Sequence, residues 1–181
     1  MTMKYHPLSE VQSNNIGIET TVWQYSIILE NAIIGEGCNI NCYVFIENDV
    51  IIGNNVTIKS GVQLWDGLRI SDNVFIGPNV TFTNNLYPRS REYPKEHISA
   101  IICEGASIGA NSTIIGNIVI GKYALVGAGS VLTKSVGDFE LWYGNPCKHR
   151  GYVSKSGRVF NLDFQDKETG KKLSFKEISN L

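Results

Sequence analysis

Histidine and cysteine are scarce in this 181-residue chain, which has three histidines and four cysteines. The cysteines are Cys38, Cys42, Cys103 and Cys147, and they lack the paired spacing of a zinc site. We therefore expect no bound metal. The cysteines are better explained as small packing residues of a protein that works in the cytoplasm.

An excess of charge and a long apolar run are also missing. The formal net charge is −1, which predicts neither nucleic acid nor an acidic membrane surface as a partner. Residues 1–10 hold no apolar stretch of signal-peptide length, and no run approaches a transmembrane span. The composition indicates one cytoplasmic domain, without membrane insertion, that is large enough to bury a core.

The apolar residues do not follow the i, i+3, i+4 spacing of an amphipathic helix, and a period of six takes its place. An aliphatic or aromatic residue stands at every sixth position from Ile16 to Phe82 and again from Ile102 to Leu132. Four positions after each stands a mostly small or medium side chain, on the same side of an extended segment. Glycine often follows the aliphatic residue and marks a corner. Short strands separated by corners predict an all-β solenoid.

Eighteen hexads, at three per turn, predict about six coils of parallel β-helix: four over 16–86 and two over 101–136, after a polar lead-in at 1–15. The repeat breaks between these blocks, which predicts a loop excursion at 83–100. We divide the chain into a solenoid domain at 1–151 and a hairpin-like β appendage at 152–181 that covers an open end of the solenoid. Three flat faces, with outward apolar residues such as Trp23 and Val119, favour a trimer.

The repeat, with its motif of an aliphatic residue, glycine and four further residues, resembles the left-handed parallel β-helix of the hexapeptide-repeat acyltransferases over about residues 16–151. The left hand is implied by this resemblance, because chain geometry alone favours right-handed crossovers. The segment from Asp72 to Arg89 resembles the nucleotide-linked 3-amino-sugar N-acetyltransferases. Those enzymes make dTDP-3-acetamido-3,6-dideoxyhexoses for bacterial surface glycans such as O-antigen or S-layer.

That family usually reads Thr-Asn-Asp where this chain has Thr83-Asn84-Asn85, and Gly-Asn-Pro-Ala-Lys where Cys147 stands. The resemblance implies that Asn84 faces the amino sugar. It also implies acetyl-coenzyme A as the donor, lying between neighbouring subunits of a homotrimer.

The excursion mixes amides, aromatic rings and two arginines, which suits a phosphorylated and hydroxylated ligand. The candidate substrate-binding residues in and around it are Trp65, Asn85, Tyr87, Arg89, Arg91 and Glu140. The candidate catalytic residues are Asn84, Asp66, which could orient the ammonium form of the amine, and His97, the one credible imidazole base. Asp66 could equally be a corner carboxylate, and His97 an ordinary loop histidine.

A second segment combines small residues with lysines and an arginine. Small residues would let an extended thiol cofactor approach the backbone of a coil, and the basic side chains could meet its phosphates. The candidate cofactor-binding residues are Gly109, Gly127, Ala128, Lys134, Asn145, Lys148 and Arg150.

The resemblance, with which these residues are consistent, implies an acetyl-coenzyme A-dependent N-acetyltransferase acting on a nucleotide-linked 3-amino-3,6-dideoxyhexose. A sugar amine is less basic than lysine, so positioning matters more than a strong base, and a backbone N–H could stabilise the oxyanion. Open alternatives are an acetyltransferase for a small unphosphorylated or UDP-4-amino-sugar substrate, and a non-catalytic scaffold. A carbonic-anhydrase-like enzyme would need three histidines on the coil faces, and the histidines here lie outside the repeats.

Overall fold

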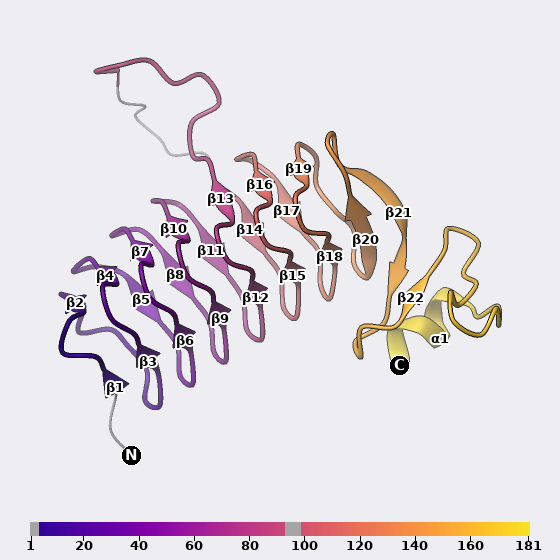
Figure 1. Ribbon diagram of the computed structural model, residues 1–181, viewed down its shortest axis with the longest axis horizontal. Coiled ribbons are helices and arrows are strands. Elements are labelled where there is room, and N and C mark those ends of the chain that lie inside the picture. Colours follow the sequence, from indigo (N-terminus) through magenta and orange to yellow (C-terminus); the bar gives the residue numbers. More distant parts are fainter. Residues whose placement is uncertain (1–3, 93–98) are drawn as a thin grey trace.

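The computed structural model describes residues 4–92 and 99–181. The chain forms a solenoid of short strands whose two termini lie at opposite ends (Figure 1). Three parallel sheets, here called A, B and C, form its sides. Sheet A contains β1 (Lys4–Tyr5), β3 (Thr21–Val22), β6 (Asn39–Ile40), β9 (Thr57–Ile58), β12 (Phe75–Ile76), β15 (Ser107–Ile108) and β18 (Leu125–Val126). Sheet B contains β2 (Glu10–Val11), β4 (Ile27–Ile28), β7 (Phe45–Ile46), β10 (Gln63–Leu64), β13 (Thr81–Phe82), β16 (Thr113–Ile114) and β19 (Val131–Leu132). Sheet C contains β5 (Ile33–Ile34), β8 (Ile51–Ile52), β11 (Arg69–Ile70), β14 (Ile101–Ile102) and β17 (Val119–Ile120).

The predicted repeat is the core of this solenoid. Each strand from β3 to β19 is two residues long, and its second residue, the aliphatic or aromatic one of the hexad, is buried. The first residue of each strand points outward, because successive side chains of a strand face opposite sides. Pairing is in register from coil to coil: Thr21 pairs with Asn39, and Asn39 with Thr57. Equivalent residues of successive hexads therefore stack into columns that fill the interior.

Side-chain oxygens link the corners of successive coils. The Oδ1 atom of Asn54 accepts a hydrogen bond from the backbone N–H of Glu36 at 2.9 Å, and Asp72 Oδ1 accepts one from Asn54 N–H at 2.7 Å. These bonds satisfy backbone donors that the two-residue strands leave over at the corners. Asparagine and aspartate at the corners are thus part of the architecture.

The solenoid has about 7 turns, one more than the repeat predicts. The difference lies at the two ends. β1 pairs with β3 and β2 with β4, so the described part of the polar lead-in already belongs to the coils. At the other end β20 (Glu140–Tyr143) adds a parallel strand to β18. Strand pairing uses backbone groups, so these segments can join the sheets without the hexad pattern.

The C-terminal residues extend sheet A beyond the last coil (Figure 1). β21 (Lys148–Val153) pairs antiparallel with β20, and β22 (Val159–Phe160) with β21. The expected boundary between 151 and 152 falls within β21. The expected β appendage also contains a short helix, α1 (Phe175–Asn180), which begins with a capping box between Ser174 and Glu177.

Aromatic rings hold this helix against the solenoid. Tyr123 and Phe139, on a corner of successive coils, stack with ring centroids 5.3 Å apart. The ring of Phe175 in α1 meets Phe139 edge-on at 6.0 Å. The appendage is therefore packed on the end of the solenoid and covers part of it.

Candidate active site

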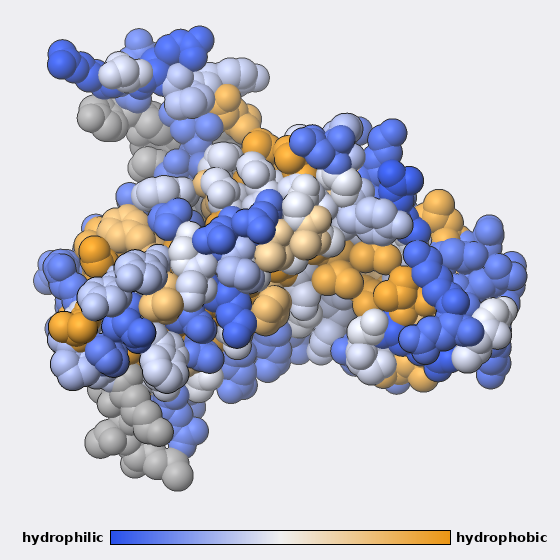
Figure 2. Space-filling view, in the orientation of Figure 1, coloured by the Kyte–Doolittle hydropathy of each residue, from blue (hydrophilic) through white to orange (hydrophobic). Residues whose placement is uncertain are grey.

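The predicted loop excursion leaves the solenoid at the corner between sheets B and C, after β13, and the chain returns at β14. It projects away from the coils (Figure 1), and Figure 2 shows that its outer part is hydrophilic. Its first residue is fixed: Thr83 N–H donates to the Ile114 carbonyl at 3.0 Å, and Thr83 Oγ1 accepts from Gly116 N–H at 3.0 Å. The next residue, half-buried Asn84, therefore starts from a rigid base.

Trp65 lies on the same corner as the base of the loop. Its Nε1–H donates to the carbonyl of Phe82, the last residue of β13, at 3.0 Å. Its ring packs against Phe45 with centroids 5.8 Å apart. Of the predicted substrate-binding residues, Trp65 is the one that directly supports the chain just before Asn84.

The other loop residues that we expect to bind substrate lie further out. Asn85 turns back on the chain, with Oδ1 accepting from Tyr87 N–H at 2.9 Å. Tyr87 is 83% exposed, and both arginines are exposed. The Arg89 guanidinium donates to the Pro88 carbonyl at 2.9 Å. His97 lies outside the described residues.

The two predicted carboxylates have partners within the fold. Asp66 lies on the same corner as Asn84, because β10 and β13 are neighbours in sheet B. Its Oδ1 atom accepts from Asp49 N–H at 2.7 Å, as the corner residues Asn54 and Asp72 do for their neighbours. Glu140 lies on sheet A, where Oε2 accepts from Gly137 N–H at 2.7 Å and Trp142 Nε1–H at 2.8 Å. Both carboxylates have a structural function, and their part in substrate binding or catalysis stays a prediction.

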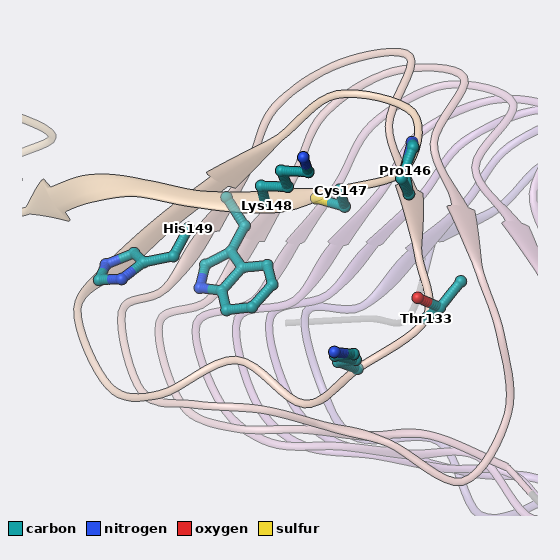
Figure 3. A pocket seen from close by; sticks show the side chains of 7 residues that line it. Thr133, Pro146, Cys147, Lys148 and His149 are labelled. Carbon is teal, nitrogen blue, oxygen red and sulfur yellow. The ribbon is translucent and has the colours of Figure 1, made fainter.

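Part of the predicted cofactor segment lines a cavity of about 320 Å³ at the C-terminal end of the solenoid (Figure 3). We call this cavity the end pocket. Its lining residues are Thr133, Lys134, Trp142, Pro146, Cys147, Lys148 and His149. Figure 3 shows Thr133 and His149 on opposite sides of it. Two predicted residues, Lys134 and Lys148, therefore share one pocket, whereas Asn145 and Arg150 are not among its lining residues.

Five lining residues of the end pocket are not among the predicted cofactor-binding residues: Thr133, Trp142, Pro146, Cys147 and His149. Trp142 and His149 stack with ring centroids 5.8 Å apart and an interplanar angle of 17°. They lie on different strands, β20 and β21, and outside the hexad repeat, so no periodic signal connects them. Arg150 sits over the Tyr143 ring at 5.4 Å, in a cation–π contact.

The thiol of Cys147 is buried at the edge of the end pocket. Burial raises the pKa of this thiol above its ordinary value, and a nearby Ser130 hydroxyl partly offsets this. Cys147 is therefore a neutral thiol at neutral pH. This state suits a packing residue better than a nucleophile.

The predicted cofactor glycines Gly109 and Gly127 lie where successive coils approach each other closely. A methyl group at Gly109 would lie 2.4 Å from the Ala128 nitrogen, and one at Gly127 would lie 2.7 Å from Tyr143 Cβ. Close packing between coils therefore explains the absence of a side chain at both positions, and their part in cofactor binding stays a prediction. Ala128, by contrast, is exposed.

We expect Gly109→Ala to lower the free energy of unfolding by about 1–3 kcal/mol, because the added methyl group overpacks two backbones. The matched control is Gly129→Asn. Gly129 has φ +68° and open space around it, and asparagine already occupies equivalent corners at positions 79 and 111. Thermal unfolding of both variants tests this, and equal melting temperatures would contradict the packing explanation.

Neither a metal centre nor a membrane span is evident in the described part of the chain. No group of three or more histidine, cysteine, aspartate or glutamate side chains there could hold a metal ion. No helix among residues 4–92 and 99–181 is long and apolar enough to cross a bilayer.

Comparison with known proteins places this arrangement in a family. The family model "Bacterial transferase hexapeptide (six repeats)" matches residues 49–84 and 99–134, on both sides of the loop. The dTDP-3-amino-3,6-dideoxy-α-D-galactopyranose 3-N-acetyltransferase of Aneurinibacillus thermoaerophilus is 54% identical over 148 residues, which are 82% of this chain and 77% of the relative. Serine acetyltransferase 4 of Arabidopsis thaliana is 40% identical over 62 residues, 34% of this chain and 18% of that protein.

Solved structures show the same fold. A UDP-N-acetylglucosamine acyltransferase of Bacteroides fragilis superposes with a TM-score of 0.70 at 19% identity, over 83% of this chain and 61% of the other. This likeness confirms the left-handed β-helix. A hexapeptide-repeat acetyltransferase of Vibrio cholerae, solved with acetyl coenzyme A, has a TM-score of 0.50 at 25% identity, over 74% of this chain and 68% of the other.

The fold, the interrupted repeat and the high identity to the Aneurinibacillus enzyme agree. The chain therefore belongs to the hexapeptide-repeat acetyltransferases, in the family of the dTDP-amino-sugar N-acetyltransferases.

Proposed function

We propose that this enzyme transfers the acetyl group of acetyl-coenzyme A to the 3-amino group of dTDP-3-amino-3,6-dideoxy-α-D-galactopyranose, for a bacterial surface glycan. The observation that carries this proposal is the 54% identity to an enzyme of that name over 82% of the chain. The identity is high enough that a shared substrate class is the simplest explanation. The galacto configuration comes from the name of that relative.

We assign the amino sugar to the corner between sheets B and C, at the base of the loop. Trp65 is hydrogen-bonded to the Phe82 carbonyl, and the Thr83 hydroxyl accepts a hydrogen bond from Gly116. The backbone immediately before Asn84 is therefore fixed, which supports Asn84 as the residue that orients the amine. The exposed arginines of the loop would meet the diphosphate, since guanidinium groups pair well with phosphate oxygens. Asp66 lies one coil away on this corner. Its Oδ1 atom already accepts a hydrogen bond from Asp49 N–H, so Asp66 would contact the sugar through the remaining lone pairs of its carboxylate.

The chemistry then depends mainly on position. The neutral amine nitrogen attacks the thioester carbonyl carbon, the C–S bond breaks, and the departing thiolate receives a proton from the amine. Holding the two reactants together supplies much of the rate enhancement. A backbone N–H of a coil would stabilise the oxyanion. We keep His97 as the candidate base against which this positioning mechanism is tested.

We further propose a homotrimer in which sheet C faces the neighbouring subunits. The outward residues of sheet C are almost all aliphatic and in register, with Arg69 in the middle: Ile33, Ile51, Ile101 and Val119, which are 45%, 40%, 47% and 40% exposed. We call this row the aliphatic stripe. Outward positions on sheet A include Thr21, Asn39, Thr57 and Ser107, so that sheet is more polar. The loop leaves the solenoid at the corner beside the aliphatic stripe, which would place the amino sugar between subunits.

Two further assignments belong to this proposal. Residues 1–151 form the catalytic solenoid, and residues 152–181 form a cap on its end that takes no part in the chemistry. We also place the enzyme in the cytoplasm, an assignment that the four cysteines support because all of them are free thiols.

Lys148→Ala tests the cofactor end of the proposal. We expect the KM for acetyl-coenzyme A to rise about tenfold and the KM for the amino sugar to change little, because one charge-assisted phosphate contact is lost. Steady-state kinetics with each substrate varied in turn gives both constants. Unchanged kinetics would show that Lys148 is a solvent-exposed charge without a ligand.

The substrate itself is tested by product analysis. The enzyme is incubated with acetyl-coenzyme A and a panel of acceptors: dTDP- and UDP-linked 3-amino and 4-amino sugars in gluco and galacto configuration, unphosphorylated sugars and serine. Mass spectrometry detects a gain of one acetyl group. We expect the highest kcat/KM for the dTDP-linked 3-amino galacto sugar. Acetylation of an unphosphorylated sugar or of serine instead would overturn the proposal, and a failure of coenzyme A to raise the melting temperature would favour a scaffold.

A further inference from the structure

The aliphatic stripe presents nearly the same side chain at each of its levels. Its outward residues follow one another from coil to coil, in steps of roughly 4.8 Å, as Ile33, Ile51, Ile101 and Val119, with Arg69 between the second and the third. Burial of apolar surface has no directional preference, so a neighbouring subunit displaced by one coil would bury almost as much aliphatic surface as an undisplaced one. Aliphatic contacts alone therefore do not fix the height at which two solenoids join.

Arg69 interrupts this repeat at the middle level of sheet C. Among the described strands of that sheet, β11 is the one whose outward residue is charged, and it lies between β8 and β14 (Figure 1). The guanidinium is held by its own chain: Nη2–H donates to Asp49 Oδ1 at 2.6 Å, and Nη1–H donates to the Asp49 and Leu68 carbonyls at 2.6 and 3.1 Å. Both side chains of the ion pair are still partly exposed. The pair is therefore complete within one subunit and lies on the surface that the proposed trimer buries.

A threefold axis places equivalent residues of the three subunits at one height. In a symmetric trimer the three Arg69–Asp49 pairs therefore form a single polar layer, with aliphatic layers on both sides of it. If one subunit is displaced by a coil, its ion pair faces aliphatic side chains, and the pairs of its neighbours face aliphatic side chains in turn. The charges then lose water without gaining polar neighbours, which is unfavourable. A single polar position in a coiled coil specifies the register of the helices for the same reason.

We propose that Arg69, paired with Asp49, sets the register in which a second copy of the chain joins the aliphatic stripe. This inference rests on the proposed function, in particular on the trimer and on an amino-sugar site between subunits. Arg69 is then a positioning residue. A displacement by one coil is several times larger than the misplacement of about 1 Å that can cost a hundredfold in rate. The three displacements in a closed ring must sum to zero, so one displaced subunit disrupts both of its interfaces and leaves one intact site.

The double variant Asp49→Asn/Arg69→Leu removes both charges and makes the stripe aliphatic throughout. Asparagine already stands at the equivalent corner one coil earlier, at Asn31, so the solenoid should fold normally. We expect sedimentation velocity to show a trimer and the melting temperature not to fall, because replacing a buried ion pair by apolar residues is often neutral or stabilising. We expect kcat per subunit to fall about threefold with both KM values unchanged, since the sites that remain are native.

Methyl NMR of the isoleucine side chains measures the register without any substrate. A symmetric trimer gives one signal for each isoleucine, because its three subunits are equivalent. A trimer with one displaced subunit gives up to three, whatever the substitutions do to the chemical shifts themselves. We expect a single signal for Ile33, two coils away from Arg69 on the stripe, in the wild type and a split signal in the double variant.

The matched control is Arg69→Lys, which keeps a charge beside Asp49 and should restore both the single signal and the wild-type kcat. An unsplit signal in the double variant would overturn the proposal, and so would dissociation of that variant, because the ion pair would then drive assembly itself. A split signal with unchanged kcat would place the whole amino-sugar site within one subunit and overturn the link to catalysis. A wild type that forms no trimer would contradict the proposed assembly as well, whereas the acetyl acceptor is tested separately by product analysis.

Discussion

Asn84→Ala should lower kcat/KM for the amino sugar about a hundredfold or more and leave the melting temperature nearly unchanged. Asn84 follows Thr83, whose two hydrogen bonds to the next coil fix the chain at the base of the loop. Its amide can both accept and donate, and so can aim the lone pair of the amine at the thioester. A misplacement of about 1 Å can cost on the order of a hundredfold in rate. Steady-state kinetics on the purified variant measures the loss.

Two other loop variants make this result specific. Asn85→Ala removes an amide of the same size that is bonded to Tyr87 N–H, and it should cost clearly less than Asn84→Ala. His97→Asn should also cost less, since a weakly basic amine has little need of a general base. Rates are compared across pH for all three. If His97→Asn alone abolishes turnover and removes an ionisation near pH 6.5, the enzyme uses a histidine base and the positioning mechanism is wrong.

The double variant Ile51→Arg/Ile101→Arg should dissociate the proposed trimer and abolish activity. Both residues lie on the aliphatic stripe, on either side of Arg69, with which each pairs directly. Two further arginines would place three like charges in a row on a surface that the proposed assembly buries, and burying unpaired charge is strongly unfavourable. Sedimentation velocity reports the assembly state, and circular dichroism shows whether the solenoid is intact.

The matched control for this variant is Ile27→Arg. Ile27 and Ile33 begin successive strands of identical sequence in the same coil, on sheets B and C, and are 37% and 45% exposed. Ile27→Arg should remain assembled and active if sheet C is the interface. Dissociation by Ile27→Arg and not by the double variant would instead assign the interface to sheet B.

The repeated pattern of the sequence was sufficient to predict the solenoid and the loop. A period of six specifies which residue of every strand is buried, and each coil contacts its neighbours, so local pattern and final structure coincide from β3 to β19. The loop was visible for the same reason, since an insertion has to break the period. The ends were less predictable. β1, β2 and β20 join the sheets by backbone hydrogen bonds, which leave no pattern in side chains, and so the turn count came out one too low.

The candidate site divides in the same way. Asn84 and Lys148 could be named from motifs that are continuous in the sequence, and the tertiary structure gave the first a rigid base and put the second beside Lys134. The stack of Trp142 on His149 was decided by tertiary structure alone, because it depends on β21 folding back on β20. Gly109 shows what the sequence alone does not reveal. Its small size suggests space for a cofactor, but in the folded chain the backbone of Ala128 occupies that space. A sequence shows that a position must be small, and only the neighbouring coil shows what fills the space.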